Sequence, residues 1–400
     1  MQTTLADFIR DTPEGREADA ILRKCVHCGF CNATCPTYQL LGDELDGPRG
    51  RIYLVKQVLE GAVPTAKTRL HLDRCLTCRS CESTCPSGVQ YGRLADLGRA
   101  IVERKVGRGA WESAKRAALA MVLPRTGLFG GLLKLGRVGR PFLPEFLKEK
   151  IPPKAEPAGE WPAPRHPRKM LALAGCVQSA LAPRINAAAA RVLDRQGISL
   201  TETPGAGCCG AVRFHLNDQE GGRDDMRALI DAWWPMVERG EVEAIVMTAS
   251  GCGSTVKEYG HLLRHDPAYR DKAARISALT KDLAEIVAES GSTSRKGGRV
   301  AFQSPCSLQH GQQIRGKVET LLQAAGYELA PVADGHLCCG SAGAYSILQP
   351  ELSAKLRERK LAALAAGGPE TIATANIGCL SHLQAGSRTP VRHWIQLLDE

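Results

Sequence analysis

Short apolar runs alternate with amphipathic segments through the second half of the chain. Apolar runs rich in β-branched residues predict buried strands over 169–175, 244–250, 299–304 and 371–377. Between them, apolar residues recur at helical spacing, and glycine closes several of these predicted helices, which cover 185–197, 224–240, 316–326 and 351–367. Because strands alternate with helices, the pattern predicts open, parallel α/β sheets.

The first part of the chain shows a different pattern. Apolar residues at helical spacing predict one helix within 46–61, at Ile52, Leu54, Val55, Val58 and Leu59. A proline-rich stretch over 151–169 predicts a stiff, exposed linker and a domain boundary. No apolar run approaches the roughly eighteen residues that a membrane span needs.

Charge changes this picture at one place. The formal net charge is +10, and residues 104–150 hold eleven Lys or Arg against three acids, Glu112, Glu145 and Glu149. Such a basic amphipathic stretch fits an anionic bilayer surface, an acidic partner subunit or a solvated linker. Nucleic acid is not an expected partner, because no binding module accompanies the charge. The opening residues MQTTLADFIR lack the pattern of a secretory leader, so a cytoplasmic protein is expected.

Two cysteine ladders dominate the chemistry of the first part. KCVHCGFCNATCP (24–36) and RCLTCRSCESTCP (74–86) share one spelling, C-x2-C-x2-C-x3-C-P. Sixteen cysteines in 400 residues are too few for a disulfide-built secreted scaffold. Structural zinc usually takes two separated CxxC pairs rather than a ladder of four. The doubled ladder is instead the bacterial ferredoxin run, which predicts two [4Fe–4S] clusters.

The ferredoxin run also predicts which cysteines share a cluster. In two-cluster ferredoxins the fourth cysteine of each run ligates the other cluster. The first cluster is therefore expected on Cys25, Cys28, Cys31 and Cys85, and the second on Cys75, Cys78, Cys81 and Cys35. Electrons can pass between two adjacent clusters. Nearby cations, here Lys24, His27, Arg74 and Arg79, would raise a cluster's potential.

The other eight cysteines form a second repeat. Cys176 is followed after 31 residues by Cys208–Cys209, and Cys306 is followed after 31 residues by Cys338–Cys339. A further cysteine closes each round, Cys252 in the first and Cys379 in the second. The repeat predicts a duplicated domain. Each set follows predicted strands, so each is expected at the carboxyl ends of its sheet.

Other interpretations of these cysteines stay open. GAGCCG (205–210) matches the dinucleotide pattern G-x-G-x-x-G, but the second copy, HLCCG, lacks the glycines. Inert buried thiols, metal or cluster ligation and a redox role for the thiols are the remaining hypotheses.

The repeat resembles the cysteine-rich CCG domain family found in heterodisulfide reductases and related electron-transfer subunits. In that family the motif ends in CxxC and can hold an unusual [4Fe–4S] cluster. Here the last cysteine is missing from both halves, since GST follows Cys252 and LSH follows Cys379. Each half keeps four thiols as a candidate metal site, and His310 or His382 is a candidate extra ligand in the second half.

The whole arrangement resembles the family of iron–sulfur subunits of glycolate oxidase (glycolate dehydrogenase), most closely in ADAILRKCVHCGFCNATCPTYQLLGDELDGPRGRIYLVKQVLEG, HLDRCLTCRSCESTCPSGVQYG and TANIGCLSHL. The expected fold is a multidomain chain of mixed α+β and α/β class. It has a mainly helical ferredoxin-type domain over 1–104, a basic, proline-rich helical or linker segment over 105–167, and two parallel α/β CCG domains over 168–292 and 293–400.

The resemblance implies a function as well. It implies a flavoprotein partner that oxidises glycolate to glyoxylate, two [4Fe–4S] clusters with one or two further clusters as candidates in the CCG domains, and a quinone-type acceptor. It also implies a place at the cytoplasmic face of the inner membrane. Iron–sulfur subunits of lactate or glycerol-3-phosphate dehydrogenases share the architecture. A heterodisulfide-reductase-like enzyme and a purely structural adaptor are rival hypotheses.

Overall fold

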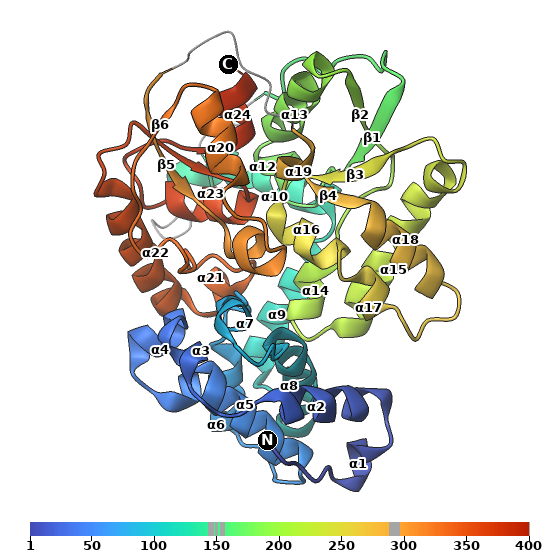
Figure 1. Cartoon of the computed structure of the whole chain (residues 1–400), viewed down its shortest axis with the longest axis vertical. Coiled ribbons are helices and arrows are strands. Elements are labelled where there is room, and N and C mark those ends of the chain that lie inside the picture. Colours follow the sequence, from blue (N-terminus) through green and yellow to red (C-terminus); the bar gives the residue numbers. More distant parts are fainter. Residues whose placement is uncertain (143–147, 149–150, 153–156, 288–296, 400) are drawn as a thin grey trace. The chain divides into compact units, whose positions relative to one another are not determined.

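The structure is a computed structural model that describes residues 1–142, 148, 151–152, 157–287 and 297–399 (Figure 1). The chain forms two compact units. The first comprises Met1–Arg116 and His336–Leu356, and the second comprises Ala117–Gly335 and Arg357–Glu400. The predicted boundary between 292 and 293 lies outside the described residues, as do Glu145, Glu149 and Lys150.

The first unit is helical. Its helices within the first hundred or so residues are α1 (Asp7–Arg10), α2 (Pro13–Lys24), α3 (Phe30–Ala33), α4 (Pro36–Leu41), η1 (Glu44–Asp46), α5 (Pro48–Leu59), α6 (Ala66–Asp73), α7 (Ser80–Thr84) and α8 (Tyr91–Val106). Helix α9 (Ala110–Val122) begins in this unit, and α21 (Tyr345–Leu348) lies on its second segment. Helix α5 confirms the helix predicted within 46–61.

Local sequence explains where the main helices of the first unit begin and meet. Proline occupies the first position of α2 and α5, where its missing N–H costs no hydrogen bond. Thr12 caps α2 by accepting from the Gly15 amide at 3.0 Å. Helices α5 and α8 approach closely at Gly98, where an added Cβ would lie 2.4 Å from Val55 Cγ2. Buried apolar residues of α2, α5, α6 and α8 form the core beside the two ladders.

The second unit holds two parallel four-stranded sheets of the same strand order. The first sheet is β2 (Ile198–Glu202), β1 (Arg168–Ala172), β3 (Ala244–Met247) and β4 (Thr280–Asp282). The second sheet is β6 (Glu328–Leu329), β5 (Arg299–Gln303), β7 (Thr371–Thr374) and β8 (Val391–His393). The four predicted strands are the two central strands of each sheet, and the predicted duplication is confirmed.

Helices surround both sheets (Figure 1). The first repeat carries α12 (Gln178–Leu181), α13 (Arg184–Arg195), α14 (Ala211–His215), α15 (Gln219–Glu238), α16 (Ser250–Val256), α17 (Tyr259–Leu262), α18 (Arg270–Leu279) and α19 (Leu283–Ile286). The second repeat carries η3 (Ser307–Gly311), α20 (Lys317–Ala324), α22 (Pro350–Ala365), α23 (Ile377–Gln384) and α24 (Trp394–Asp399). These confirm the four helices predicted in this part.

One apolar core joins the two repeats of the second unit. It contains residues from both sheets and from the alanine-rich helix α13, which packs against α24 of the other repeat. Arg191 on α13 pairs with Asp399 on α24 at 2.6 Å. Buried His393 on β8 contacts the Thr248 carbonyl, just after β3, at 2.8 Å. The two sheets therefore form one folded body.

Helices also occupy part of the predicted basic segment. Helix α10 (Thr126–Gly139) follows α9, and η2 (Arg140–Phe142) ends the continuous stretch. No single helix in the described ranges has the length and apolar content to cross a membrane. The pair Ala110–Val122 and Thr126–Phe142 meets both criteria only when taken together, and it bends by 107° at the break.

Candidate functional site

The two ladders line two neighbouring pockets in the first unit. One pocket, here the first ferredoxin site, is lined by Cys25, Cys28, Cys31 and Cys85, with Cys81 also at its wall. The other, the second ferredoxin site, is lined by Cys35, Cys75, Cys78 and Cys81. Each pocket thus brings together three cysteines of one ladder and the last cysteine of the other. This is the grouping that crossed ligation requires, and the ligation itself stays a prediction.

The backbone of the ladders wraps each pocket in the same way. His27 and Gly29 of the first ladder have φ of 61° and 86°, and Thr77 and Arg79 at the matching positions of the second have 53° and 58°. Three of these four are not glycine, so the left-handed turns are strained and must be held by their surroundings. Alternating turns of this kind aim backbone N–H groups inward, and the Thr77 amide lies 3.4 Å from Cys75 Sγ.

Two buried guanidinium groups lie beside the second ferredoxin site. Arg99 is 7% exposed and donates to the carbonyls of Cys75 and Leu72 and to Thr77 Oγ1. Arg51 is 1% exposed and lines the pocket itself. Burial raises the pKa of the Cys75 thiol, but the charges of Arg51 and Arg99, with hydrogen bonds from Tyr91 and the Thr77 amide, outweigh it and leave that pKa lowered. Negative charge is therefore stabilised at this site.

The first ferredoxin site has the opposite electrostatics. Burial and the neighbouring thiolate charge of Cys25 raise the pKa of Cys31 to about 11. The nearest guanidinium, Arg49, is about a third exposed and already paired with Glu44 at 2.6 Å. The side chains of Val26 and Phe30 at the rim are 69% and 61% exposed. This pocket is thus open at its rim and has no buried cation among the residues that line it.

Four thiols in each pocket fit a metal cluster with thiolate ligands. All sixteen cysteines are free thiols. Burial and mutual repulsion raise the pKa of Cys31 and Cys81, so four thiolates could not gather in either pocket without a cation among them. A bound metal core supplies that charge and deprotonates the thiols outright. The donor set is all sulfur, the ligand that iron–sulfur clusters take.

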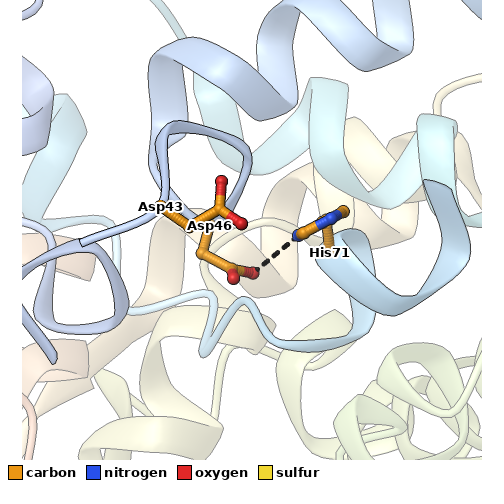
Figure 2. A group of neighbouring side chains, drawn as sticks. All are labelled: Asp43, Asp46 and His71. Carbon is orange, nitrogen blue, oxygen red and sulfur yellow. Dashed lines mark hydrogen bonds and ion pairs between the residues drawn. The ribbon is translucent and has the colours of Figure 1, made fainter. Parts of the chain in front are cut away.

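A third group of potential ligands lies near the second ferredoxin site. Asp43, Asp46 and His71 place one ligand atom each within 4.8 Å of one another (Figure 2). The Asp46 carboxylate is fully buried and already bonded to His71 Nδ1 at 3.1 Å, Arg74 at 2.8 Å and Arg51 at 3.4 Å. Two guanidinium groups on one carboxylate repel a metal ion, so we interpret the group as an ion-pair network. It holds Arg51 beside the cysteines, since Arg51 also donates to the His71 carbonyl at 2.7 Å.

The first CCG set comes together in the second unit. Hydrogen bonds link Cys176 to Cys208, Cys208 to Cys209 and Cys209 to Cys252. The bonds from Cys176 and Cys209, with the Gly210 amide at 3.4 Å, lower the pKa of Cys208. Cys176 follows β1 and Cys252 follows β3, the two strands between which the chain changes direction along the sheet. Parallel sheets bind ligands at that point, as the sequence predicts.

The dinucleotide alternative gains no support from this loop. The glycine run 205–210 ends at α14, a helix of five residues, and its variable positions are the buried cysteines themselves. The pattern G-x-G-x-x-G binds a pyrophosphate at the start of a long helix that directly follows a strand.

The second CCG set is divided between the two units. The loop with Cys338 and Cys339 belongs to the first unit, and Cys306 and Cys379 belong to the second. Cys338 Sγ accepts from the Gly340 amide at 3.4 Å, as Cys208 does from Gly210 in the first repeat. Convergence of these four cysteines stays a prediction.

The two candidate histidine ligands differ in setting. His310 is buried in the π-helical turn η3 just after Cys306, and His382 is half-buried on α23, three residues after Cys379. A ligand role for either one stays a prediction.

Buried Tyr345, at the start of α21, also reaches the second ferredoxin site. Tyr345 is 7% exposed, and its hydroxyl donates to the Arg74 carbonyl at 3.1 Å, next to Cys75 in the chain. Burial raises the pKa of Tyr345, and charge on Cys75 and Cys338 adds to the rise. Tyr345 therefore lies near a cysteine of the ladder and a cysteine of the second CCG set. Sequence reasoning missed it, as it missed Arg51 and Arg99.

Two family models match this chain. The 4Fe-4S dicluster domain matches residues 21–89, and the cysteine-rich domain (CCG) matches residues 170–257 and 300–384. The fold and the sites thus define an iron–sulfur protein with a dicluster domain followed by a duplicated cysteine-rich domain. This confirms the fold class expected from the sequence.

Relatives of the same architecture give the family. The glycolate oxidase iron-sulfur subunit of Escherichia coli (strain K12) is 54% identical over 403 residues, which cover 100% of this chain and 99% of that protein. The probable glycolate oxidase iron-sulfur subunit of Bacillus subtilis (strain 168) is 31% identical over 91% of this chain and 89% of that protein. The chain belongs to the family of glycolate oxidase iron–sulfur subunits, as its sequence motifs predict.

More distant matches cover part of the chain or show the fold alone. Lactate utilization protein A of Exiguobacterium sp. is 23% identical over 56% of this chain and 94% of that protein. A crystal structure of a hypothetical protein from Helicobacter pylori has a TM-score of 0.53 at 10% identity, covering 96% of this chain and 71% of that one.

Proposed function

We propose that this chain is the electron-transfer subunit of a glycolate-oxidising complex. It receives electrons from a flavin on a partner subunit and passes them towards a quinone-type acceptor. The observation that carries the proposal is the pair of adjacent four-cysteine pockets in a chain that is 54% identical to a glycolate oxidase iron-sulfur subunit.

The chemistry of the substrate requires a division of labour. Oxidation of glycolate to glyoxylate releases two electrons and two protons, with one hydrogen leaving carbon as a hydride equivalent. Iron–sulfur clusters bound in the two pockets would carry single electrons and accept no hydride, so a flavin must take the hydride first. The two dehydrogenase alternatives, lactate and glycerol-3-phosphate, use the same division, and the closer relatives favour glycolate.

The residues of this chain then act on electrons alone. Cys25, Cys28, Cys31 and Cys85 would hold one cluster, and Cys75, Cys78, Cys81 and Cys35 the other. Arg51 and Arg99 stabilise added negative charge at the second ferredoxin site. The two CCG sets, Cys176, Cys208, Cys209 and Cys252 and then Cys306, Cys338, Cys339 and Cys379, are candidate sites for one or two further clusters.

Helix α10 supports attachment to an anionic membrane surface. Large apolar residues recur at spacings of three or four along α10 and into η2, and they are 40–91% exposed: Leu128, Leu132, Leu135 and Val138 on α10 and Phe142 on η2. The exposed cations Arg125 and Lys134 lie among them. An exposed apolar stripe with interspersed cations is the pattern of a helix that lies in a bilayer surface. A solvated linker is not expected to carry such a stripe of exposed apolar residues.

Two cations of the predicted basic segment serve the fold instead. Arg137 donates to the Pro152 carbonyl at 3.3 Å and Arg140 to the Ile151 carbonyl at 3.1 Å. They hold the end of α10 to the following chain. On α10 and its two ends, the exposed cations are therefore Arg125 and Lys134.

Anaerobic purification with the partner subunits tests the proposal. The complex should contain flavin and iron, and glycolate should reduce the iron–sulfur absorbance of this chain. The chain purified alone should contain iron and sulfide but no flavin, and it should not oxidise glycolate. Turnover of glycolate by the isolated chain would contradict the division of labour. Clusters that stay oxidised in the active complex would favour a structural adaptor.

A further inference from the structure

The two ferredoxin sites differ in the charge built around them. The second ferredoxin site has Arg51 and Arg99 beside it, both nearly inaccessible to solvent. Among the residues that line the first, the guanidinium is that of Arg49, which Glu44 neutralises at 2.6 Å. A reduced cluster carries one more negative charge than an oxidised cluster, so buried cations raise its reduction potential. Screening by water weakens the same effect at an exposed pair.

Arg99 is the guanidinium that bonds directly to the loop carrying Cys75. The positive charge of Arg51 is offset by the buried Asp46 carboxylate at 3.4 Å. Arg99 donates to neutral acceptors, the carbonyls of Leu72 and Cys75 and the Thr77 hydroxyl, while the charges of Asp96 and Asp73 act on it from nearby. These bonds fix the charge against the loop that carries Cys75.

Access to the two sites differs in the same sense. Cys28 is exposed, and the rim residues Val26 and Phe30 stand out into solvent. At the second ferredoxin site, Tyr345 bonds to the Arg74 carbonyl and brings the loop of Cys338 nearby. One site is thus accessible to a partner, and the other adjoins a cysteine of the second CCG set.

We propose that the buried pair Arg51 and Arg99 makes the second ferredoxin site the higher-potential member of the pair, so that electrons arrive at the first site and move downhill to the second. Each transfer moves one electron from a reduced to an oxidised cluster and makes or breaks no bond. This inference rests on the proposed function only in assuming that both sites hold clusters.

A redox titration of the full chain, followed by EPR with a chemical reductant, tests this polarity. Two one-electron couples are expected. The variants Cys28→Ser and Cys78→Ser assign them, because each alters the line shape of the cluster at its own site. The Cys78→Ser change should appear in the higher-potential couple and the Cys28→Ser change in the lower.

Arg99→Gln should then shift only the higher-potential couple. We expect its one-electron equilibrium constant to fall about tenfold, which is about 59 mV. Arg99→Lys keeps the charge but loses the forked hydrogen bonds, so it should restore most of the potential. Arg49→Gln is the matched control at the first site. It should change the one-electron equilibrium constant of either couple by less than about threefold, because the charge of Arg49 is already neutralised and screened.

Several results would overturn the polarity. The first is assignment of the higher-potential couple to the first site. The second is an Arg99→Gln variant that shifts the potential of the lower-potential couple, or of neither couple. The third is an Arg99→Lys shift in potential as large as that of Arg99→Gln. The last would show that Arg99 only braces the loop. If Arg99→Gln does not fold, the assignment by Cys28→Ser and Cys78→Ser still decides. Because a chemical reductant is used, failure of glycolate to reduce the complex would contradict the proposed function and leave the polarity standing.

Discussion

The ion-pair network at Asp46 makes a prediction about stability. Asp46→Asn removes a fully buried carboxylate that bonds to Arg51, Arg74 and His71. Arg74 is partly exposed and can turn to water, but the Arg51 side chain is 1% exposed and would lose its carboxylate partner. Breaking a buried ion pair by removing one partner costs about 3–5 kcal/mol. We expect the free energy of unfolding of the first unit to fall by about that amount.

Thermal unfolding of the anaerobic, cluster-loaded chain measures this loss. A loss of about 3–5 kcal/mol lowers the apparent melting temperature by about 10 °C or more. Asp43→Asn is the matched control, because Asp43 is exposed and caps η1 by accepting from the Leu45 amide at 2.9 Å. Asparagine and aspartate are equally good caps, so the control should lie within about 0.5 kcal/mol of the wild type.

Two outcomes would refute the interpretation of Asp43, Asp46 and His71 (Figure 2) as part of an ion-pair network. Equal, small effects of Asp46→Asn and Asp43→Asn would show that the buried charges do not stabilise the unit. A chelator of divalent ions that lowers the melting temperature of the wild type but not of Asp46→Asn would show that Asp43, Asp46 and His71 hold a metal ion.

Further predictions concern the second unit and the surface. Burial lowers the pKa of His393 from 6.5 to about 4. Between these two pH values the unfolded chain binds a proton at this residue and the folded chain does not. The stability that neutral His393 contributes is therefore lost as the pH falls from about 6.5 to 4. The full loss of stability is about 3 kcal/mol. Urea denaturation of the wild type and of His393→Gln, repeated across this pH range, should show the difference between their unfolding free energies change by that amount. A difference that stays constant with pH would contradict the prediction. The double change Leu135→Asp with Val138→Asp should abolish sedimentation of the chain with anionic lipid vesicles, whereas Val63→Asp, at another exposed residue, should not. If the double variant still sediments with the vesicles, contact with an acidic partner or a linker remains as the role of the basic segment. Cys338→Ser should block electron transfer to the acceptor while substrate still reduces the ferredoxin-type clusters, and Cys208→Ser should be milder; the reverse order would reverse the roles of the two CCG halves.

The sequence was most informative where residue type and spacing alone determine the chemistry. The doubled ladder predicted three cysteines of each pocket, because i, i+3 spacing acts over a few residues, and the ferredoxin pattern supplied the fourth cysteine from the other ladder. The central strands β1, β3, β5 and β7 were predictable because strands buried on both faces are continuous apolar runs. The edge strands β4, β6 and β8 have only two or three residues each and leave no comparable pattern.

Contacts between distant segments could not be predicted in the same way. Arg99 lies 24 residues from the Cys75 carbonyl it binds, and Tyr345 lies 271 residues from Arg74. An arginine within an amphipathic helix is usually solvated, so its burial depends on what packs above it. The loop of Cys338 and Cys339 lies within the second match of the cysteine-rich domain, residues 300–384, and its contacts with the first unit are of the kind that sequence does not reveal.

Crossed ligation of the two ferredoxin sites can be tested by cysteine substitutions compared by EPR. The full chain would be prepared anaerobically with Cys35→Ser, Cys85→Ser, Cys28→Ser or Cys78→Ser. The account predicts that Cys85→Ser alters the same cluster signal as Cys28→Ser, and that Cys35→Ser alters the same signal as Cys78→Ser. The opposite pairing, in which Cys35→Ser acts with Cys28→Ser and Cys85→Ser with Cys78→Ser, would show that each ladder holds its own cluster and would contradict the account.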